Sequence, residues 1–168
     1  FGGRCGDNLM KNLSGVIYTN KNNTVTADYY RPFAQAGTQN DPYIVDAEAV
    51  PFLPDFFEVL FYSDVMSYFM LGCDIDNVSA PFGRYLQNVV FDGNGHKITF
   101  DSSGGFYYLF DSIFDNAVVK NLITDGSKVQ AAIADSNSGL IYNCLNYADF
   151  SPSMVNRNYG RIVNCCNF

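Results

Sequence analysis

Short apolar stretches alternate with turns rich in Asn, Asp, Ser and Gly along the last two thirds of the chain. Three stretches carry nearly the same phrase: VVKNLITDG around Asn121, LIYNCLNYA around Asn143 and RIVNCCNF around Asn164. The three asparagines follow one another at nearly equal separations, with a period of roughly 20 residues that is typical of a solenoid. In a β-solenoid, each coil is stable only when a neighbouring coil covers its apolar face.

The three asparagines, which we call the asparagine ladder, are expected to occupy left-handed turns and to hydrogen-bond from coil to coil. An acidic turn is expected at residues 73–77, CDIDN, and a tight turn at 92–96, DGNGH. The strands predicted from the pattern lie at residues 43–45, 68–71, 88–91, 97–100, 107–110, 118–123, 131–134, 140–145, 154–155 and 161–166.

The spacing of these strands decides the fold class. Little room remains for crossover helices, which excludes a doubly wound sheet, and a sandwich would not explain three Asn-centred phrases. We therefore predict an all-β fold with a minor α component: a right-handed parallel β-helix of about five coils. Residues 37–168 form the β-helix, and residues 1–36 form an N-terminal β-hairpin or extended arm, with strands near 16–19 and 24–30 around an NKNN turn.

One stretch is too apolar to face water and has helix signals. Asp46 is a plausible N-cap for residues 47–50, and Pro51 and Pro54 interrupt and restart a helix that runs from about 54 to 62. We expect this helix, near 47–62, to cover one end of the solenoid.

Charge narrows the partners. The chain of 168 residues has 10 Lys and Arg against 17 Asp and Glu, a formal charge of -7, which disfavours nucleic acid and anionic membranes. No apolar run approaches the roughly 20 residues of a membrane span. The chain begins at Phe1, as expected of a mature form after signal removal or of a trimmed segment.

The cysteines and the glycosylation patterns bear on where the protein is located. Acceptor patterns for N-glycosylation at Asn12, Asn22 and Asn77 often occur by chance but permit the secreted or cell-surface location that we expect. No CxxC pair or His spacing indicates zinc. Cys144 and Cys165 would stack about 4.8 Å apart in successive coils, as a buried thiol ladder or as a disulfide. The candidates for disulfide bonds are Cys5, Cys73, Cys144, Cys165 and Cys166.

A family resemblance covers residues 37–168. The series GTQNDPYIV, YFMLGCDIDN, VVFDGNGHKITF and YYLFDSIFDNAVVKNLITDG, followed by AIADSNSGLIYNC and MVNRNYGRIVNC, resembles bacterial cell-surface β-helix proteins with GLUG-type repeats. Where that family has a GGLVG-like segment, this chain has YLFDS, AIADS and MVNRN. The resemblance implies a right-handed parallel β-helix on secreted or surface-attached proteins, often adhesive, and brings no catalytic residues.

Candidate chemistry is sparse. His96 is the only histidine, and no GxSxG motif accompanies it. Asp74, Asp76 and Asp92 would have to gather in a groove to serve as paired acids or calcium ligands. Acidic turns in a surface protein are usually only solvated, so we predict no enzyme activity, no metal site and no cofactor.

Aromatic residues leave two further interpretations open. The chain has 12 Tyr and 15 Phe but no Trp. Most are expected in the core and between coils, but some could form a sugar-stacking platform or a protein interface. These are Tyr29, Tyr30, Phe33, Phe106, Tyr107 and Tyr108.

The last coil leads to the main functional hypothesis. An open coil exposes unpaired backbone groups that invite another strand, so we expect an extracellular structural protein that assembles head to tail with copies of itself into a filament or surface layer. The predicted interface residues are Tyr18, Tyr29, Tyr30, Phe33, Arg161, Cys165, Cys166 and Phe168. The alternatives are a monomeric adhesin or glycan-binding module, with surface glycans as partners, and a carbohydrate-active β-helix enzyme.

Overall fold

The computed structural model describes residues 18–19, 25–26, 33, 35–101, 108–126, 132–148 and 153–168. The chain divides into two compact units, residues 1–34 and residues 35–168. In the first unit, β1 (Tyr18–Thr19) pairs antiparallel with β2 (Val25–Thr26) across the NKNN segment, as the alternation of β-forming residues predicted.

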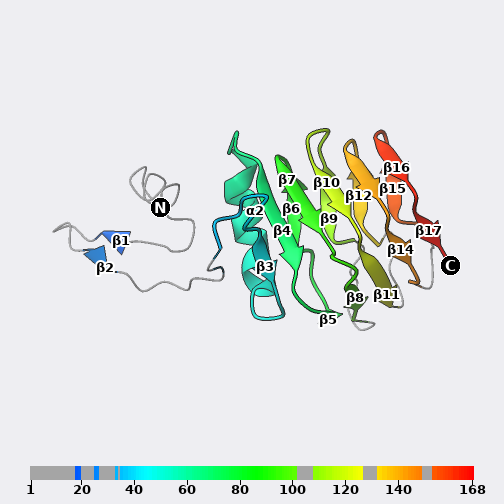
Figure 1. Cartoon of the computed structure of the whole chain (residues 1–168), viewed down its shortest axis with the longest axis horizontal. Helices are drawn as coiled ribbons and strands as arrows, with labels where there is room; N and C mark the ends of the chain where they lie inside the picture. Colours follow the sequence, from blue (N-terminus) through cyan, green and yellow to red (C-terminus); the bar gives the residue numbers. More distant parts are fainter. Residues whose placement is uncertain are drawn as a thin grey trace. The chain divides into compact units, whose positions relative to one another are not determined.

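The second unit is a parallel β-helix, which confirms the predicted fold class. Its described strands form three sheets that run along the solenoid (Figure 1). The first sheet holds β3 (Tyr43–Val45), β4 (Ser67–Leu71), β7 (Val89–Asp92), β10 (Val118–Lys120), β13 (Leu140–Tyr142) and β16 (Arg161–Val163). The second holds β5 (Ile75–Val78), β8 (Lys97–Phe100), β11 (Ile123–Gly126), β14 (Leu145–Asn146) and β17 (Cys166–Asn167). The third holds β6 (Gly83–Leu86), β9 (Phe110–Ile113), β12 (Ala134–Asn137) and β15 (Val155–Asn158).

One strand from each sheet makes a turn, so β4–β6, β7–β9, β10–β12 and β13–β15 are complete turns. The pair β16–β17, which we call the fifth turn, follows them. The strands of the first sheet pair in register, and every second side chain of this sheet points inward. In the second sheet the pairing of β5 with β8 has a register shift. Phe69, Phe91, Val119 and Ile141 are aligned one above the other and fully buried. Ile162 continues this row in the fifth turn but is 38% exposed.

A short helix covers the other end of the solenoid, as predicted (Figure 1). The 3-10 helix η1 (Val50–Phe52) leads into α2 (Leu53–Phe61), where Pro54 occupies a first-turn position that needs no N–H partner. The expectation that Asp46 caps a helix over residues 47–50 was wrong, because η1 begins at Val50 with Ala49 as its N-cap. Asp46 Oδ1 instead accepts from the Ala49 N–H at 3.0 Å in the turn before η1. The buried face of α2 places the Phe57 ring 4.8 Å from Phe69 and 5.9 Å from Phe110.

Several predicted boundaries were wrong, and the asparagines explain the main error. The strands expected at 118–123, 140–145 and 161–166 each break into two, because Asn121, Asn143 and Asn164 have positive φ and turn the chain from the first sheet into the second. The expected acidic turn at 73–77 contains most of β5, and β6 was not foreseen at all. No helix in the described part of the chain is both long and apolar enough to cross a membrane.

Candidate functional site: amide rows and the exposed fifth turn

The asparagine ladder has the expected geometry. Asn121, Asn143 and Asn164 all have positive φ, the left-handed conformation that Asn tolerates better than most other residues with a side chain. Asn143 Nδ2 donates to Asn121 Oδ1 at 2.7 Å, and Asn164 Nδ2 donates to Asn143 Oδ1 at 3.0 Å. Each amide therefore donates toward the preceding turn and presents its oxygen to the following one.

The asparagine ladder begins at a carboxylate. Asp92 Oδ1 accepts from Asn121 Nδ2 at 2.9 Å, and Asp92 Oδ2 lies 2.9 Å from Lys120 Nζ. Partial burial, the largest single influence, opposes ionisation of Asp92. Hydrogen bonds from Asn121, Lys120 and the Asn94 N–H together outweigh it and lower the pKa of this carboxyl. The carboxylate thus fixes the direction in which the amides point.

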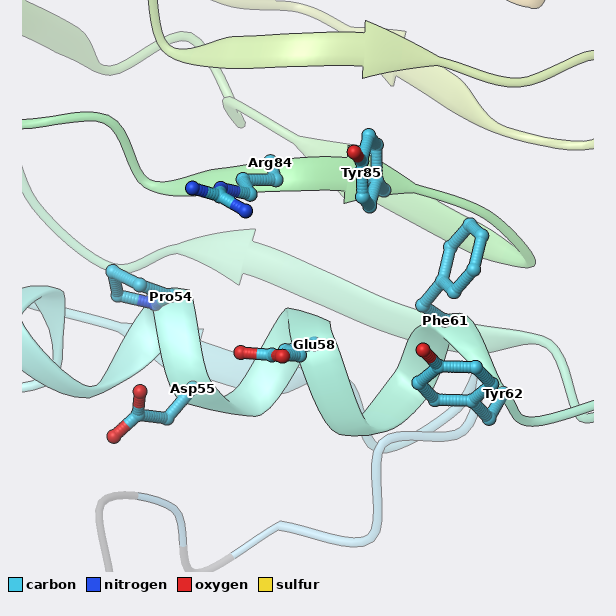
Figure 2. A pocket seen from close by; sticks show the side chains of 7 residues that line it. All are labelled: Pro54, Asp55, Glu58, Phe61, Tyr62, Arg84 and Tyr85. Carbon is cyan, nitrogen blue, oxygen red and sulfur yellow. The ribbon is translucent and has the colours of Figure 1, made fainter.

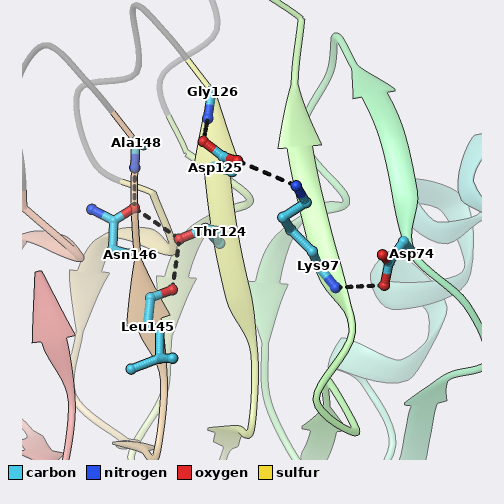
Figure 3. A network of polar contacts seen from close by, with 8 residues as sticks. All are labelled: Asp74, Lys97, Thr124, Asp125, Gly126, Leu145, Asn146 and Ala148. Atoms are coloured by element: carbon cyan, nitrogen blue, oxygen red, sulfur yellow. Dashed lines mark hydrogen bonds and ion pairs between the residues drawn. The ribbon is translucent and has the colours of Figure 1, made fainter. Parts of the chain in front are cut away.

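Two further polar rows lie inside the solenoid, where the core changes from apolar to amide. In the second sheet the inward row runs from Ile75 and Ile98 to Thr124, Asn146 and Asn167. Thr124 Oγ1 donates to Asn146 Oδ1 at 2.8 Å, and that oxygen also accepts from the Ala148 N–H (Figure 3). Both Thr124 and Asn146 are fully buried, so these bonds form in a medium of low dielectric constant.

The third sheet repeats this change. Its inward row runs from Leu86 and Ile113 to Asn137 and Asn158. Asn137 is buried and donates through Nδ2 to Asn158 Oδ1 at 2.7 Å, while its own Oδ1 accepts from the Gly139 N–H at 3.1 Å. We refer to the asparagine ladder and these two inward rows together as the amide rows.

The amide rows all reach the exposed end of the described solenoid. Asn158, Asn164 and Asn167 lie in exposed positions at that end, on β15, at the β16–β17 corner and on β17. Apolar side chains accompany them: Val163 is 42% exposed and Phe168 is 66% exposed. The Phe168 ring stacks on Tyr147 of the previous turn at 4.5 Å, almost parallel to it. This edge therefore combines aligned amides, exposed apolar side chains and the strands β15, β16 and β17, each of which is the last strand of its sheet at this end.

A pair of thiols lies beside the asparagine ladder. Cys144 is buried, and its N–H donates to Cys165 Sγ at 3.4 Å. A hydrogen bond from the Cys144 thiol, together with backbone N–H groups, lowers the pKa of Cys165 to about 6. Bonding to Cys165, then burial, raises the pKa of Cys144. Cys73, Cys144, Cys165 and Cys166 are free thiols, and Cys5 lies outside the described residues.

The structure brings only part of the predicted interface together. Arg161, Cys165, Cys166 and Phe168 lie in the fifth turn. In the first unit, Tyr18 belongs to β1 and Phe33 is buried. Tyr29 and Tyr30 lie outside the described residues, as do Phe106 and Tyr107 of the aromatic platform. Asn137, Asn146 and Asn158 were not predicted as site residues from the sequence. Each is separated by about one coil from the next residue in its row, but this spacing was hard to recognise because the residues around each asparagine differ.

The candidate acids are engaged separately. Asp74 Oδ1 lies 3.0 Å from His96 Nδ1 and accepts from the Lys97 N–H at 3.0 Å, and Lys97 Nζ reaches Asp125 at 3.3 Å (Figure 3). The His96 and Lys97 bonds lower the pKa of Asp74, the Lys97 N–H contributing most. Asp76 is exposed on β5. Within the described residues, no group of three His, Cys, Asp or Glu side chains is arranged to hold a metal ion.

Fold and amide rows define the class of this protein: a parallel β-helix with a helical cap at one end and an amide-lined turn at the other. Comparison with protein-family models, with curated proteins and with solved structures found no match.

Proposed function

We propose that this protein is an extracellular structural subunit that stacks head to tail with copies of itself through the exposed fifth turn. The observation that carries the proposal is the convergence of the amide rows on one exposed edge. Stacked Asn side chains and open strand edges are the features by which β-structures extend from one chain to the next.

The direction of the asparagine ladder, in which each amide donates toward the preceding turn, favours a head-to-tail contact over a two-fold one. At the exposed end of the asparagine ladder, Asn164 has already used Nδ2 on Asn143 and presents its Oδ1. A two-fold contact would bring two such oxygens together. A parallel strand from the opposite end of another copy can instead offer a donor, and a contact between different surfaces repeats without closing.

The order of the strands in each sheet identifies the second surface of the proposed head-to-tail contact. Strands β15, β16 and β17 lie at one edge of the three sheets, and β6, β3 and β5 lie at the other. Helix α2 packs on β6, so the third sheet is covered at that end. The incoming edge would therefore be formed by β3 and β5, the strands at the ends of the first and second sheets.

The test measures assembly of the full chain by sedimentation velocity and negative-stain electron microscopy. Wild-type protein is expected to form concentration-dependent linear assemblies. Ile162→Lys places a charge in the exposed edge of the fifth turn and should abolish these assemblies. Val65→Lys is the control: it places the same charge at an exposed apolar residue outside the fifth turn and should leave assembly unchanged. Dispersed wild-type monomers, or Ile162→Lys assemblies as long as those of wild type, would reject the proposal.

A mixing experiment tests the head-to-tail geometry. An Ile162→Lys subunit keeps its β3 and β5 edge, so it should join the exposed fifth turn of a wild-type assembly and stop growth there. A small fraction of this variant should shorten the assemblies. A two-fold contact predicts that the variant is left out and that assembly length does not change.

A further inference from the structure

A small pocket lies between α2 and β6, outside the amide rows. It has a volume of about 150 Å³ and is lined chiefly by Asp55, Glu58, Phe61, Tyr62, Arg84 and Tyr85. Figure 2 shows Arg84 and Tyr85 on the strand opposite Glu58 and Phe61 on the helix. The pocket belongs to the capped end of the solenoid, far from β17 (Figure 1).

An aromatic cluster forms one wall of the pocket. The Phe61 ring lies 5.0 Å from Tyr85, 5.2 Å from Tyr62 and 5.7 Å from Phe114. Tyr62 is 81% exposed and Tyr85 is 38% exposed, so both tyrosines present ring surface and a hydroxyl group to solvent. A soluble protein gains nothing in stability from aromatic surface left in water, and such surface commonly marks a binding site.

The polar part of the pocket carries charges of both signs. None of the four ion pairs of the described residues involves Asp55, Glu58 or Arg84, although the charge of Arg84 also acts on Asp111. The two carboxylates accept hydrogen bonds only, and the guanidinium donates only. The two carboxylates outnumber the single guanidinium, so the lining opposes an anionic ligand. Neutral hydroxyl groups can both donate to Glu58 and accept from Arg84, whereas a cationic ligand could use the carboxylates alone.

We propose that the pocket binds one neutral sugar residue of a glycan. The C–H face of a pyranose ring would lie on the Tyr85 and Phe61 surface, and its hydroxyls would bond Glu58 and Arg84. The volume supports a single ring, because pockets for larger ligands measure about 300–1,000 Å³. The pocket is lined by residues of the α2 region and β6, and not by the fifth turn or by the β3 and β5 strands of the proposed contact, so the sugar site is argued independently of the proposed assembly.

The test uses saturation-transfer NMR and calorimetry on the full chain. The neutral probes are the methyl glycosides of glucose, galactose and mannose; a sialic acid methyl glycoside and choline are the anionic and cationic probes. At least one neutral glycoside is expected to bind, and neither charged probe should bind. Binding of a charged probe alone, or of no probe at all, would overturn the proposal.

Three variants locate the site. Tyr85→Ala should weaken binding of the neutral glycoside about tenfold, since ring contacts of this kind contribute up to ~1.5 kcal/mol. Glu58→Gln, which keeps size and removes charge on an exposed side chain, should weaken it less and keeps the test valid if Tyr85→Ala fails to fold. Tyr159→Ala removes an exposed ring from another turn and should bind as wild type. Unchanged binding by both pocket variants would place the sugar elsewhere.

Discussion

The two ends of this solenoid are built from the same coil but filled with different chemistry. At the first end α2 closes over an aromatic core, where Phe57 contacts Phe69 and Phe110. At the other end the inward positions hold Asn146, Asn167, Asn137 and Asn158, and the fifth turn is exposed. The change from one filling to the other takes place along continuous inward rows, so it comes from side chains and not from a change of fold.

This difference separates stability from specificity. Apolar burial is large but non-directional, so rings such as Phe57 and Phe69 can hold a coil in place without specifying what may be added to it. An amide row provides less energy but requires a donor opposite an acceptor at a fixed register. The aromatic end is therefore suited to closing the solenoid, and the amide end to accepting a matched strand.

The largest expected effect is loss of the cap. Phe57→Ala should lower the free energy of unfolding by about 3–5 kcal/mol, because the ring is buried against two other aromatics and its removal leaves a cavity. Ile162→Ala, in the exposed fifth turn, should cost no more than about 1 kcal/mol, since part of its side chain already contacts water. Urea denaturation followed by circular dichroism measures both. Equal losses would show that the two ends do not differ in packing.

A smaller effect is expected in the asparagine ladder. Asn143→Ala should cost about 2–3 kcal/mol, from the left-handed backbone that Ala tolerates poorly and from the two lost amide bonds. Asn143→Gly removes the same bonds but accepts the positive φ of this position, so its loss should be about half as large. Asn164→Ala breaks only the bond to Asn143 and should cost less than Asn143→Ala. If Asn143→Gly lowered the free energy of unfolding as much as Asn143→Ala does, the left-handed backbone would contribute nothing to the loss.

Features that repeat along the chain could be predicted from the sequence more readily than features that occur once. The ladder residues Asn121, Asn143 and Asn164 stand in matching phrases, so their left-handed turns and mutual bonds were predicted and are confirmed. Strands β5 and β6 were missed because each has few apolar residues and depends on the next turn for its hydrogen bonds. The α2–β6 pocket could not be foreseen, since its residues come from two segments that only the winding of the chain brings together.

The smallest expected effect concerns two cysteines that occupy the same position in successive turns. Cys144 is buried while Cys165, directly after it in the row, is half-buried with its pKa lowered to about 6. Cys165 should therefore be largely thiolate at pH 7 and react with iodoacetamide at a rate that rises with a midpoint near pH 6, while Cys144 stays unmodified in the folded protein. Peptide mapping by mass spectrometry distinguishes these thiols from Cys166.

The substitution Cys144→Ala assigns the cause of the shifted Cys165 pKa. It removes the thiol donor, the largest influence on Cys165, but keeps the backbone N–H at 3.4 Å, so the alkylation midpoint should move upward toward the ordinary thiol value without reaching it. An unchanged midpoint would mean that backbone groups alone hold the charge. A thiolate stabilised by the turn beneath it would make the exposed edge more negative beside Asn164, which favours an incoming N–H or amide donor over a second acceptor. The thiol pair would then act in the same direction as the amide row.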